Sequence, residues 1–338
     1  MPVRVPANWI VGFAVLAMSG TLSCGPSERE TENVRVVAEP VVFGAPSGAG
    51  EDGVVLLAFE DESYCSGVLV GEGTVLTARH CVSELGEGIF ACRAEGGLSL
   101  HQGSGGTFVR DRDANAIRVF VGAARPATGA VPAARGRRVV TDGAATICGH
   151  DMAVVLLDHA LEGATPLQLR GSDMRVGESL RLIGWGVDES GMPVTNRRAR
   201  DGLAVSRQGP APEIAPHGSA LTAGELEIGE SACDGDSGGA IVDSNGALVG
   251  ILSRGDGDRR EARGPACFGT AAANVASVVH AHAALIAMAL PPAGSGEPTS
   301  TACTAAPCAV TCGGAWAAVM AIAALMLSAR RCPQRRRA

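Results

Sequence analysis

The sequence predicts an all-β body, a sandwich or a barrel, between two chain ends of different character. From about residue 41 to residue 290, short apolar or alternating runs are separated by Gly, Asp and Asn, which is the pattern of strands joined by turns. No repeat has the period of a solenoid or a propeller. The 338 residues are 46% hydrophobic, which is enough for a sizeable core.

Eight runs in this body are predicted to be strands because each is short, apolar and bounded by turn residues. They are VVLLAF from residue 54, SGVLVG from 66, TVLTA from 74, IRVFVG from 117, MAVVLL from 152, SLRLIGWG from 179, GAIVD from 239 and ALVGILS from 247. One stretch differs, because residues 276–290, which end in AALIAMAL, have a helical pattern. We therefore predict one helix at the end of the body.

The N-terminal 24 residues are predicted to be a secretory signal peptide. Arg4 supplies an early positive charge, and an apolar stretch and small residues follow it, as in such signals. The sequence TLSC, which ends at Cys24, resembles a bacterial lipobox with its leucine one place closer to the cysteine than usual. A lipidated Cys24 and an ordinary signal with an incidental cysteine both remain open. Residues 25–40 are interpreted as a propeptide or linker.

The C-terminal end is predicted to direct the chain to a membrane or the cell surface. Residues 291–312 form a flexible stem that begins rich in Pro, Gly, Ser and Thr. Residues 313–329 are apolar and just long enough to span a bilayer, and residues 330–338 carry arginines that favour a cytoplasmic location. This tail resembles the sorting tails of myxobacterial surface proteins, which are removed during export. A permanent single-span anchor is the alternative, and both place the body outside.

Charge and cysteine content predict an exported chain that does not bind nucleic acid. The 35 acidic residues exceed the 28 basic ones, six of which lie in the two ends, so the body repels polyanions. Every basic residue is Arg, which suggests a GC-rich bacterial genome. Eleven cysteines in an exported chain argue for disulfides. Because no pair has CxxC spacing, we expect no metal, and we expect no cofactor.

A serine, a histidine and an aspartate stand in three distinctive stretches. Ser237 lies in SACDGDSGGAIV, His80 in VLTARHCV and Asp151 in CGHDMAVVLL. A serine hydroxyl becomes a good nucleophile only when a base takes its proton and a third group holds that base in one tautomer. These three residues are therefore candidates for nucleophile, base and orienting acid.

These stretches, with CSGVLVG from residue 65 and LIGWG from 182, resemble the trypsin-like serine peptidases, which have the chymotrypsin fold. The resemblance covers residues 41–290 and implies two six-stranded antiparallel Greek-key barrels with a C-terminal helix. It implies that His80 is the general base, that Asp151 orients it and that Ser237 attacks the scissile carbonyl. The backbone N–H groups of Gly235 and Ser237 are expected to form the oxyanion hole.

The resemblance also implies disulfides and an activation step. Cys65 with Cys81 and Cys233 with Cys267 match bridges of the family, whereas Cys92 with Cys148 is the remaining pair in the body. In the family, a newly cut N-terminus inserts and its ammonium pairs with the acid beside the serine, here Asp236. Val41 stands at the right distance before Cys65 to be that terminus. It follows Pro40, however, after which most peptidases cut poorly.

The specificity pocket can be located from the same resemblance. Its base is expected at Ser231, six positions before the nucleophile, and its walls at Ser253, Gly255 and Thr270. A neutral base favours an uncharged, small-to-medium apolar residue before the scissile bond. Asp256 and Asp258 lie nearby and could still attract a basic side chain.

Two other functions fit parts of the sequence. A family member that has lost catalysis would survive as a binding module, although such relatives usually substitute one of the three catalytic residues. The stretch around Ser237 also satisfies the G-x-S-x-G elbow of the α/β-hydrolases, which would make the chain an esterase. The expected partners are a protein or peptide substrate and a membrane, reached through residues 313–329 and a lipidated Cys24. We expect a monomer.

Overall fold

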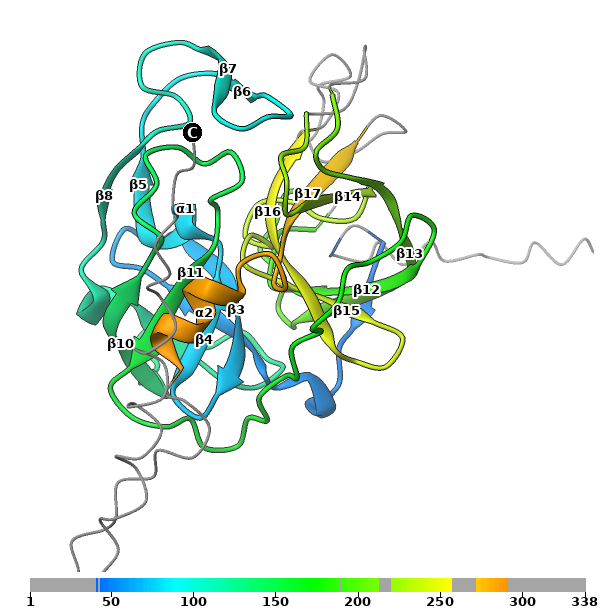
Figure 1. Cartoon of the computed structure of the whole chain (residues 1–338). Coiled ribbons are helices and arrows are strands. Elements are labelled where there is room, and N and C mark those ends of the chain that lie inside the picture. Colours follow the sequence, from blue (N-terminus) through cyan, green and yellow to red (C-terminus); the bar gives the residue numbers. More distant parts are fainter. Residues whose placement is uncertain (1–40, 42, 189, 213–219, 257–271, 291–338) are drawn as a thin grey trace, which may run out of the picture. The chain divides into compact units, whose positions relative to one another are not determined.

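The computed structural model describes residues 41, 43–188, 190–212, 220–256 and 272–290. These residues form two six-stranded antiparallel barrels and a short C-terminal helix, as the resemblance implied (Figure 1). Every strand pairing within the barrels is antiparallel. The parallel sheet required for the α/β-hydrolase alternative is therefore not the fold of this chain, and that alternative is wrong.

The first barrel closes in the order β10-β11-β4-β3-β2-β9. Its strands are β2 (Val54–Ala58), β3 (Tyr64–Gly71), β4 (Thr74–Thr77), β9 (Arg118–Phe120), β10 (Ala134–Val140) and β11 (Ala153–Leu157). Its interior is lined by side chains such as Val55, Leu69 and Val155, which are fully buried. β-branched and leucine side chains at these positions suit a strand with a buried face.

The second barrel is a sheet in the order β13-β12-β15-β16-β17-β14 that closes through pairing of β13 with β14. Its strands are β12 (Ser179–Gly184), β13 (Arg198–Gln208), β14 (Glu225–Gly229), β15 (Ala240–Asp243), β16 (Leu248–Asp256) and β17 (Ala273–Val278). The short β1 (Ala45–Pro46) adds to the edge of β13. The sequence did not single out β10, β13, β14 or β17, because charged residues interrupt several of these strands.

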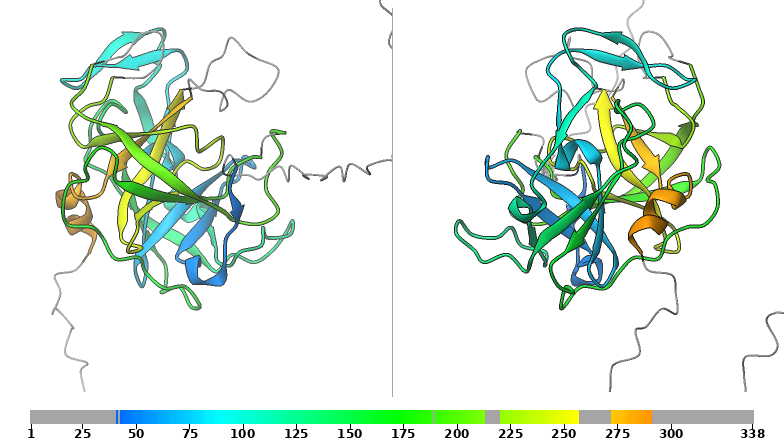
Figure 2. Two further views of the ribbon diagram at one scale, coloured as in Figure 1. Left: turned by 90° about the vertical axis from the view of Figure 1, so that its right-hand side faces the viewer. Right: turned by 60° about the vertical axis from the view of Figure 1, so that its left-hand side comes forward.

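Small elements lie outside the barrel strands. They are η1 (Ala49–Glu51), η2 (Ala114–Ala116), α1 (Arg79–Val82), and the strand pairs β5 (Ser83–Leu85) with β8 (Phe108–Asp111) and β6 (Phe90–Cys92) with β7 (Leu98–His101). The β6–β7 hairpin, in cyan, stands at the margin of the molecule in each view (Figures 1 and 2).

The predicted C-terminal helix is shorter than expected. The helix α2 spans Ala283–Ala289, whereas residues 276–278 belong to β17, where they pair with β14 and β16. Hydrogen bonds to two neighbouring strands outweigh the intrinsic helix propensity of these residues. Leu285 and Ile286 of α2 are buried in an apolar cluster that joins residues of both barrels.

Several predicted segments lie outside the described residues. They are the signal peptide (1–24), the propeptide or linker (25–40), the stem (291–312), the apolar run (313–329) and the basic tail (330–338). Within the part of the chain that the structure describes, no helix is both long and apolar enough to cross a membrane.

Candidate active site

His80 and Asp151 are brought together by the first barrel. His80 lies on α1, directly after β4, and Asp151 lies just before β11, the strand that pairs with β4. The imidazole Nδ1 is 2.8 Å from Asp151 Oδ2, and the His80 backbone N–H donates to Oδ1 at 2.9 Å. Asp151 thus holds both the ring and the backbone of His80, which directs the other ring nitrogen, Nε2, away from the aspartate.

Ser253, on β16 of the second barrel, completes this arrangement. Its hydroxyl donates to Asp151 Oδ2 at 2.6 Å, and the Ser277 hydroxyl of β17 donates to the Asp151 carbonyl at 3.2 Å. The sequence placed Ser253 in a pocket wall, but its side chain faces the aspartate. Asp151 is fully buried, and a buried carboxylate is stable only when its oxygens accept hydrogen bonds or face a cation.

The pKa values of this pair move in opposite directions. Burial lowers the pKa of His80, but the charge and hydrogen bond of Asp151 outweigh it, so the pKa lies above the ordinary value of 6.5. Burial raises the pKa of Asp151, but the charge of His80 and the hydrogen bonds from His80 and Ser253 bring it below 3.8. The pair therefore favours a charged aspartate beside an imidazole that accepts protons readily.

Ser237 lies in a turn between β14 and β15 of the second barrel. The Ser66 N–H of β3 donates to the Ser237 carbonyl at 2.8 Å and ties the turn to the first barrel. Ser237 is partly exposed. Within the described residues, no hydrogen bond joins its hydroxyl to His80 Nε2. Gly235, the expected oxyanion-hole residue, has φ of +89°, and an added Cβ would stand 2.3 Å from Tyr64 Cε2, so only glycine fits there.

Asp236 is fully buried between Gly235 and Ser237. Its Oδ1 accepts the Gly186 N–H at 2.7 Å and its Oδ2 accepts the Cys233 N–H at 3.0 Å. An added Cβ at Gly186 would stand 2.3 Å from Oδ2, which explains the last glycine of LIGWG. Burial raises the pKa of Asp236 to about 7. No ion pair to Asp236 is present among the described residues.

Ser66 is a site residue that the sequence analysis missed. It is fully buried, its hydroxyl donates to the Gly235 carbonyl at 3.1 Å, and it accepts the Trp185 N–H at 3.0 Å. The hydroxyl therefore connects the turn that carries Ser237 to both barrels. In the stretch CSGVLVG, Ser66 follows Cys65 and resembles any other residue of a strand. No pattern in the sequence therefore distinguishes Ser66.

Two of the predicted pocket residues, Ser231 and Gly255, are linked through the side chain of Asn274. Ser231 is fully buried, and its hydroxyl donates to the Gly229 carbonyl at 3.0 Å. Asn274 of β17, which the sequence analysis did not name, donates to the Ser231 hydroxyl at 3.2 Å and pairs with Gly255 of β16. Thr270 lies outside the described residues. An amide side chain in a mostly apolar strand was the available signal for Asn274.

Two arginines flank the site. Arg79 precedes His80, but its guanidinium turns away from the base, stacks 4.0 Å from the centroid of Phe108 and donates to the Ala144 carbonyl at 2.7 Å. Arg254 follows Ser253 and donates two hydrogen bonds, of 2.6 and 3.0 Å, to the buried carboxylate of Glu225. This charge pair neutralises Arg254 at the edge of the site.

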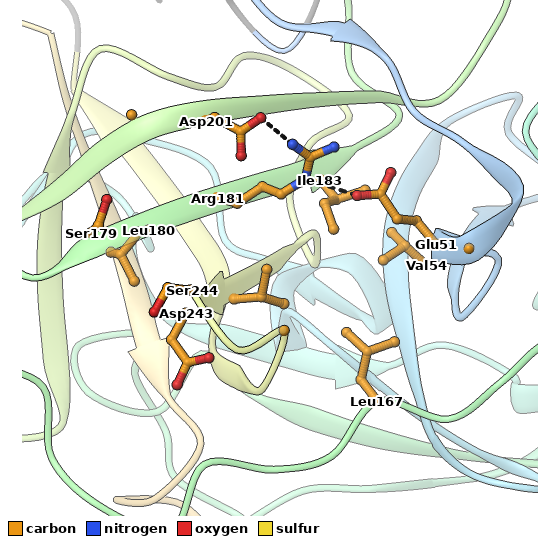
Figure 3. Close-up of a pocket in the computed structure, with 14 residues that line it drawn as sticks. Glu51, Val54, Leu167, Ser179, Leu180, Arg181, Ile183, Asp201, Asp243 and Ser244 are labelled. Carbon is orange, nitrogen blue, oxygen red and sulfur yellow. Dashed lines mark hydrogen bonds and ion pairs between the residues drawn. The ribbon is translucent and has the colours of Figure 1, made fainter.

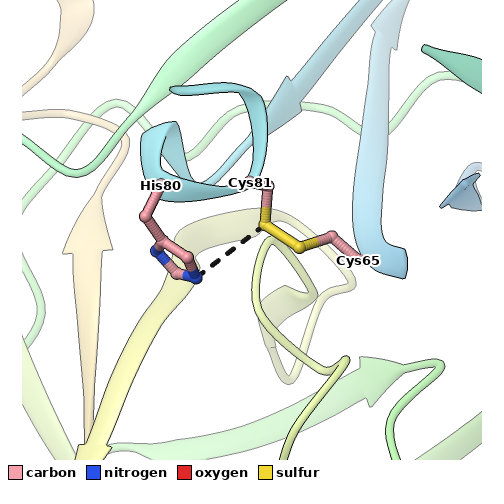
Figure 4. A group of neighbouring side chains, drawn as sticks. All are labelled: Cys65, His80 and Cys81. Carbon is pink, nitrogen blue, oxygen red and sulfur yellow. Dashed lines mark hydrogen bonds between the residues drawn. A yellow bond between two sulfur atoms is a disulfide. The ribbon is translucent and has the colours of Figure 1, made fainter. Parts of the chain in front are cut away.

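Disulfides lie beside the candidate catalytic residues. Cys65 is bonded to Cys81 and Cys92 to Cys148. Cys233 is disulfide-bonded, and Cys267, the partner expected for it, lies outside the described residues. Figure 4 shows the Cys65–Cys81 bridge beside the imidazole, with Cys81 Sγ 3.9 Å from His80 Nε2. Because these two sulfurs are bonded to each other, this group offers no thiolate to a metal.

A cavity of about 450 Å³ lies elsewhere, between β2, β12, β13 and β15. None of His80, Asp151 and Ser237 lines it. The carboxylates of Glu51 and Asp201 point into it, and each is paired with Arg181 between them (Figure 3).

The fold and these contacts define a class of protein: two antiparallel barrels with a histidine–aspartate pair on one and a serine in a glycine-rich turn on the other. The family model described as Trypsin matches residues 41–279. The chain belongs to the trypsin family and is a serine-type endopeptidase.

Curated relatives agree with this assignment. The beta-fibrinogenase mucrofibrase-4 of Protobothrops mucrosquamatus is 28% identical over 234 residues, which cover 64% of this chain and 77% of that protein. The thrombin-like enzyme elegaxobin-2 of Protobothrops elegans is 28% identical, with coverage of 64% and 84%. A protein C activator of Agkistrodon contortrix contortrix is 26% identical, with coverage of 68% and 90%.

Proposed function

We propose that this chain is an exported serine endopeptidase that cleaves peptide bonds with His80, Asp151 and Ser237. The observation that carries the proposal is the hydrogen-bonded chain from Ser253 through Asp151 to His80 Nδ1. It leaves Nε2 as the nitrogen that can take a proton. The wide separation of these residues in the sequence favours a selected arrangement over a chance cluster.

The proposed reaction follows from the roles of these groups. His80 Nε2 takes the proton of the Ser237 hydroxyl as Ser237 Oγ bonds to the scissile carbonyl carbon. The N–H groups of Gly235 and Ser237 stabilise the oxyanion. His80 then returns the proton to the leaving amine, and the C–N bond breaks to leave an acyl-enzyme ester. Water, activated by the same nitrogen, hydrolyses the ester and releases the acid product.

Activation is proposed to depend on a cut before Val41. The Val41 side chain is fully buried in the same core cluster as Ala232, four residues before Asp236. Asp236 accepts two backbone hydrogen bonds but forms no ion pair among the described residues, and burial raises its pKa to about 7 against a smaller opposing effect of the Arg125 charge. A free ammonium at Val41 would supply a directly paired charge. The uncut chain would then be a zymogen.

The substrate is proposed to be a protein or peptide, cut after an uncharged small-to-medium residue. Ser231 and Asn274 carry no charge, so a basic side chain would lose its hydration without gaining a partner there. Export is proposed from residues 1–24, and surface attachment or sorting from residues 313–329 and a lipidated Cys24. The bacterial source and the monomeric state are proposed on the same sequence grounds.

The competing function is a binding module that has lost catalysis. What favours it is the missing hydrogen bond between the Ser237 hydroxyl and His80. In catalytically active enzymes without substrate this contact is often long and tightens only when substrate binds.

The direct test is labelling with a fluorophosphonate, which reacts covalently only with an activated serine. We expect labelling of the wild-type enzyme and about 10⁶-fold slower peptide hydrolysis by Ser237→Ala, with Ser206→Ala as a control that keeps full activity.

Activity should rise with pH through a midpoint above 6.5, because the raised pKa of His80 keeps the base protonated below that midpoint. A wild-type chain, cut before Val41, that neither labels nor cleaves would establish the binding module.

A further inference from the structure

Asn274 occupies the space between the expected base and wall of the specificity pocket. It lies on β17, where it pairs with Gly255 of β16 on one side and with Ile228 of β14 on the other. The residue is only 4% exposed. The amide nitrogen Nδ2 donates to the Gly229 carbonyl at 3.1 Å and to the Ser231 hydroxyl at 3.2 Å. Asn274 therefore reaches from β17 to the segment that carries Ser231.

The orientation of this amide follows from its partners. A backbone carbonyl such as that of Gly229 can only accept, so the nitrogen and not the oxygen of Asn274 must face it. The oxygen Oδ1 then points to the other side, toward β16, where a Cβ added to Gly255 would stand 2.7 Å from it. No described residue donates a hydrogen bond to Oδ1. Among the described residues, the amide oxygen is therefore the hydrogen-bond acceptor of this group that is not already used.

The Ser231 hydroxyl is occupied by the same contacts. It donates its single proton to the Gly229 carbonyl at 3.0 Å and accepts a hydrogen bond from Asn274. Gly255 lies two residues beyond Ser253, whose hydroxyl holds Asp151, so the space beside Gly255 adjoins the catalytic residues. Asn274 thus lies between Gly255 and Ser231.

We propose that Asn274 closes the base of the specificity pocket, so that the enzyme accepts a short uncharged residue, alanine or serine, before the scissile bond. This rests on the proposed peptidase function. A short side chain fits above the amide, and a serine hydroxyl can donate to Oδ1. Leucine and phenylalanine require volume that the amide fills. Among the described side chains Ser231 and Asn274, arginine finds only neutral acceptors, which do not replace the hydration of a buried cation.

The test compares peptides that differ only in the residue before the cut: Ala, Ser, Leu, Phe and Arg. The wild-type enzyme, cut before Val41, should show kcat/KM for Ala and Ser at least tenfold above that for Phe and Arg. Asn274→Gly removes the amide, so kcat/KM for Leu or Phe should rise at least tenfold relative to that for Ala. Asn274→Ala should change the ratio in the same direction by less, and it retains strand propensity if the glycine variant does not fold. The exposed Asn196→Ala variant is the matched control and should keep the wild-type ratios.

Three outcomes would overturn the proposal. A wild-type enzyme that prefers Phe, Leu or Arg over Ala and Ser contradicts it directly. Unchanged residue preferences in Asn274→Gly and Asn274→Ala, with fluorophosphonate labelling at the wild-type rate, show that Asn274 does not limit the pocket while the peptidase function stands. A wild-type chain that neither labels nor cleaves any peptide refutes the peptidase function, and the pocket proposal with it.

Discussion

His80 and Asp236 are both titratable side chains of the candidate site, and of these two only His80 forms an ion pair among the described residues. Asp151 bonds to the imidazole at 2.8 Å and is itself held by Ser253 at 2.6 Å. Asp236 is as deeply buried as Asp151, yet it accepts only two backbone N–H groups and has no ion pair among the described residues. The two carboxylates consequently have pKa values that move in opposite directions.

This difference shows that the two barrels contribute different parts of the candidate site: His80 and Asp151 lie on the first barrel, and Ser237 and Asp236 lie in a turn of the second. The base and its orienting acid are assembled by strand pairing within the first barrel and by one hydroxyl from β16, so they need nothing further. The turn that carries Ser237 is built around a buried carboxylate that forms no ion pair among the described residues, and a buried charge without a direct partner destabilises the conformation that contains it. We therefore expect His80 and Asp151, the histidine side, to have their active arrangement already in the uncut chain. The turn with Asp236 and Ser237, the serine side, is expected to reach its active arrangement only after the cut before Val41.

Replacing Asp151, the acid of the histidine side, should have the largest effect on kcat. Asp151→Asn keeps the shape of the side chain but loses the charge that raises the pKa of His80 and the acceptor that fixes its tautomer. We expect kcat to fall about 10⁴-fold, measured with a peptide substrate on the cut enzyme. The exposed pair of Asp158 and His159, 2.8 Å apart, gives the matched control, and Asp158→Asn should leave kcat unchanged. A loss under tenfold in Asp151→Asn would mean that another group orients the base.

Replacing Asp236, the acid without an ion pair among the described residues, should lower the activity of the cut enzyme and raise the stability of the uncut chain. Folding raises the pKa of Asp236 from 3.8 to about 7, so between these values the folded state holds a proton that the unfolded state has lost. This contribution to the free energy of unfolding therefore falls as pH rises from about 4 to 7, by about 4 kcal/mol for three pKa units. We expect Asp236→Asn to make unfolding in urea less dependent on pH and to raise stability at pH 8.

Two comparisons check that prediction. Asp243, buried but paired with Arg170 at 3.2 Å, is the matched control, and Asp243→Asn should lower stability at pH 8. The cut form of Asp236→Asn should lose about 10²- to 10³-fold in kcat, the size of an oxyanion-hole defect, because the ammonium no longer has a carboxylate to hold. Equal slopes of stability against pH in the wild type and Asp236→Asn would contradict the raised pKa of Asp236.

The smallest effect on kcat is expected from removing the Ser66 hydroxyl, which connects the turn that carries Ser237 to both barrels. Ser66→Ala removes the bond to the Gly235 carbonyl and leaves the Trp185 N–H without its acceptor. We expect about a tenfold loss in kcat with KM unchanged, and an equal loss of affinity for a boronic acid inhibitor that mimics the tetrahedral state. Ser83→Ala, which removes a buried hydroxyl bonded to Asp111, is the control and should change neither value. A loss confined to KM would assign Ser66 to substrate binding.

The sequence predicted those parts of the site that lie in local motifs. The eight apolar runs became strands because a buried face requires apolar residues at fixed spacing, and the stretches around His80, Asp151 and Ser237 identified the family. Ser66 and Asn274 could not be found this way, because their importance arises from partners 119 and 43 residues away. The hydrogen bond from Ser253 to Asp151 was missed for the same reason, since only strand pairing decides which side chain Ser253 faces.

The most direct test of the unequal assembly is the rate of fluorophosphonate labelling in two forms of the chain, uncut and starting at Val41. We predict that the form starting at Val41 reacts at least a hundredfold faster, that Asp236→Asn removes this difference, and that the pKa of His80, followed by NMR, is the same in both forms. Equal labelling rates in the two wild-type forms would contradict the account, because the serine side would then be assembled without the new N-terminus.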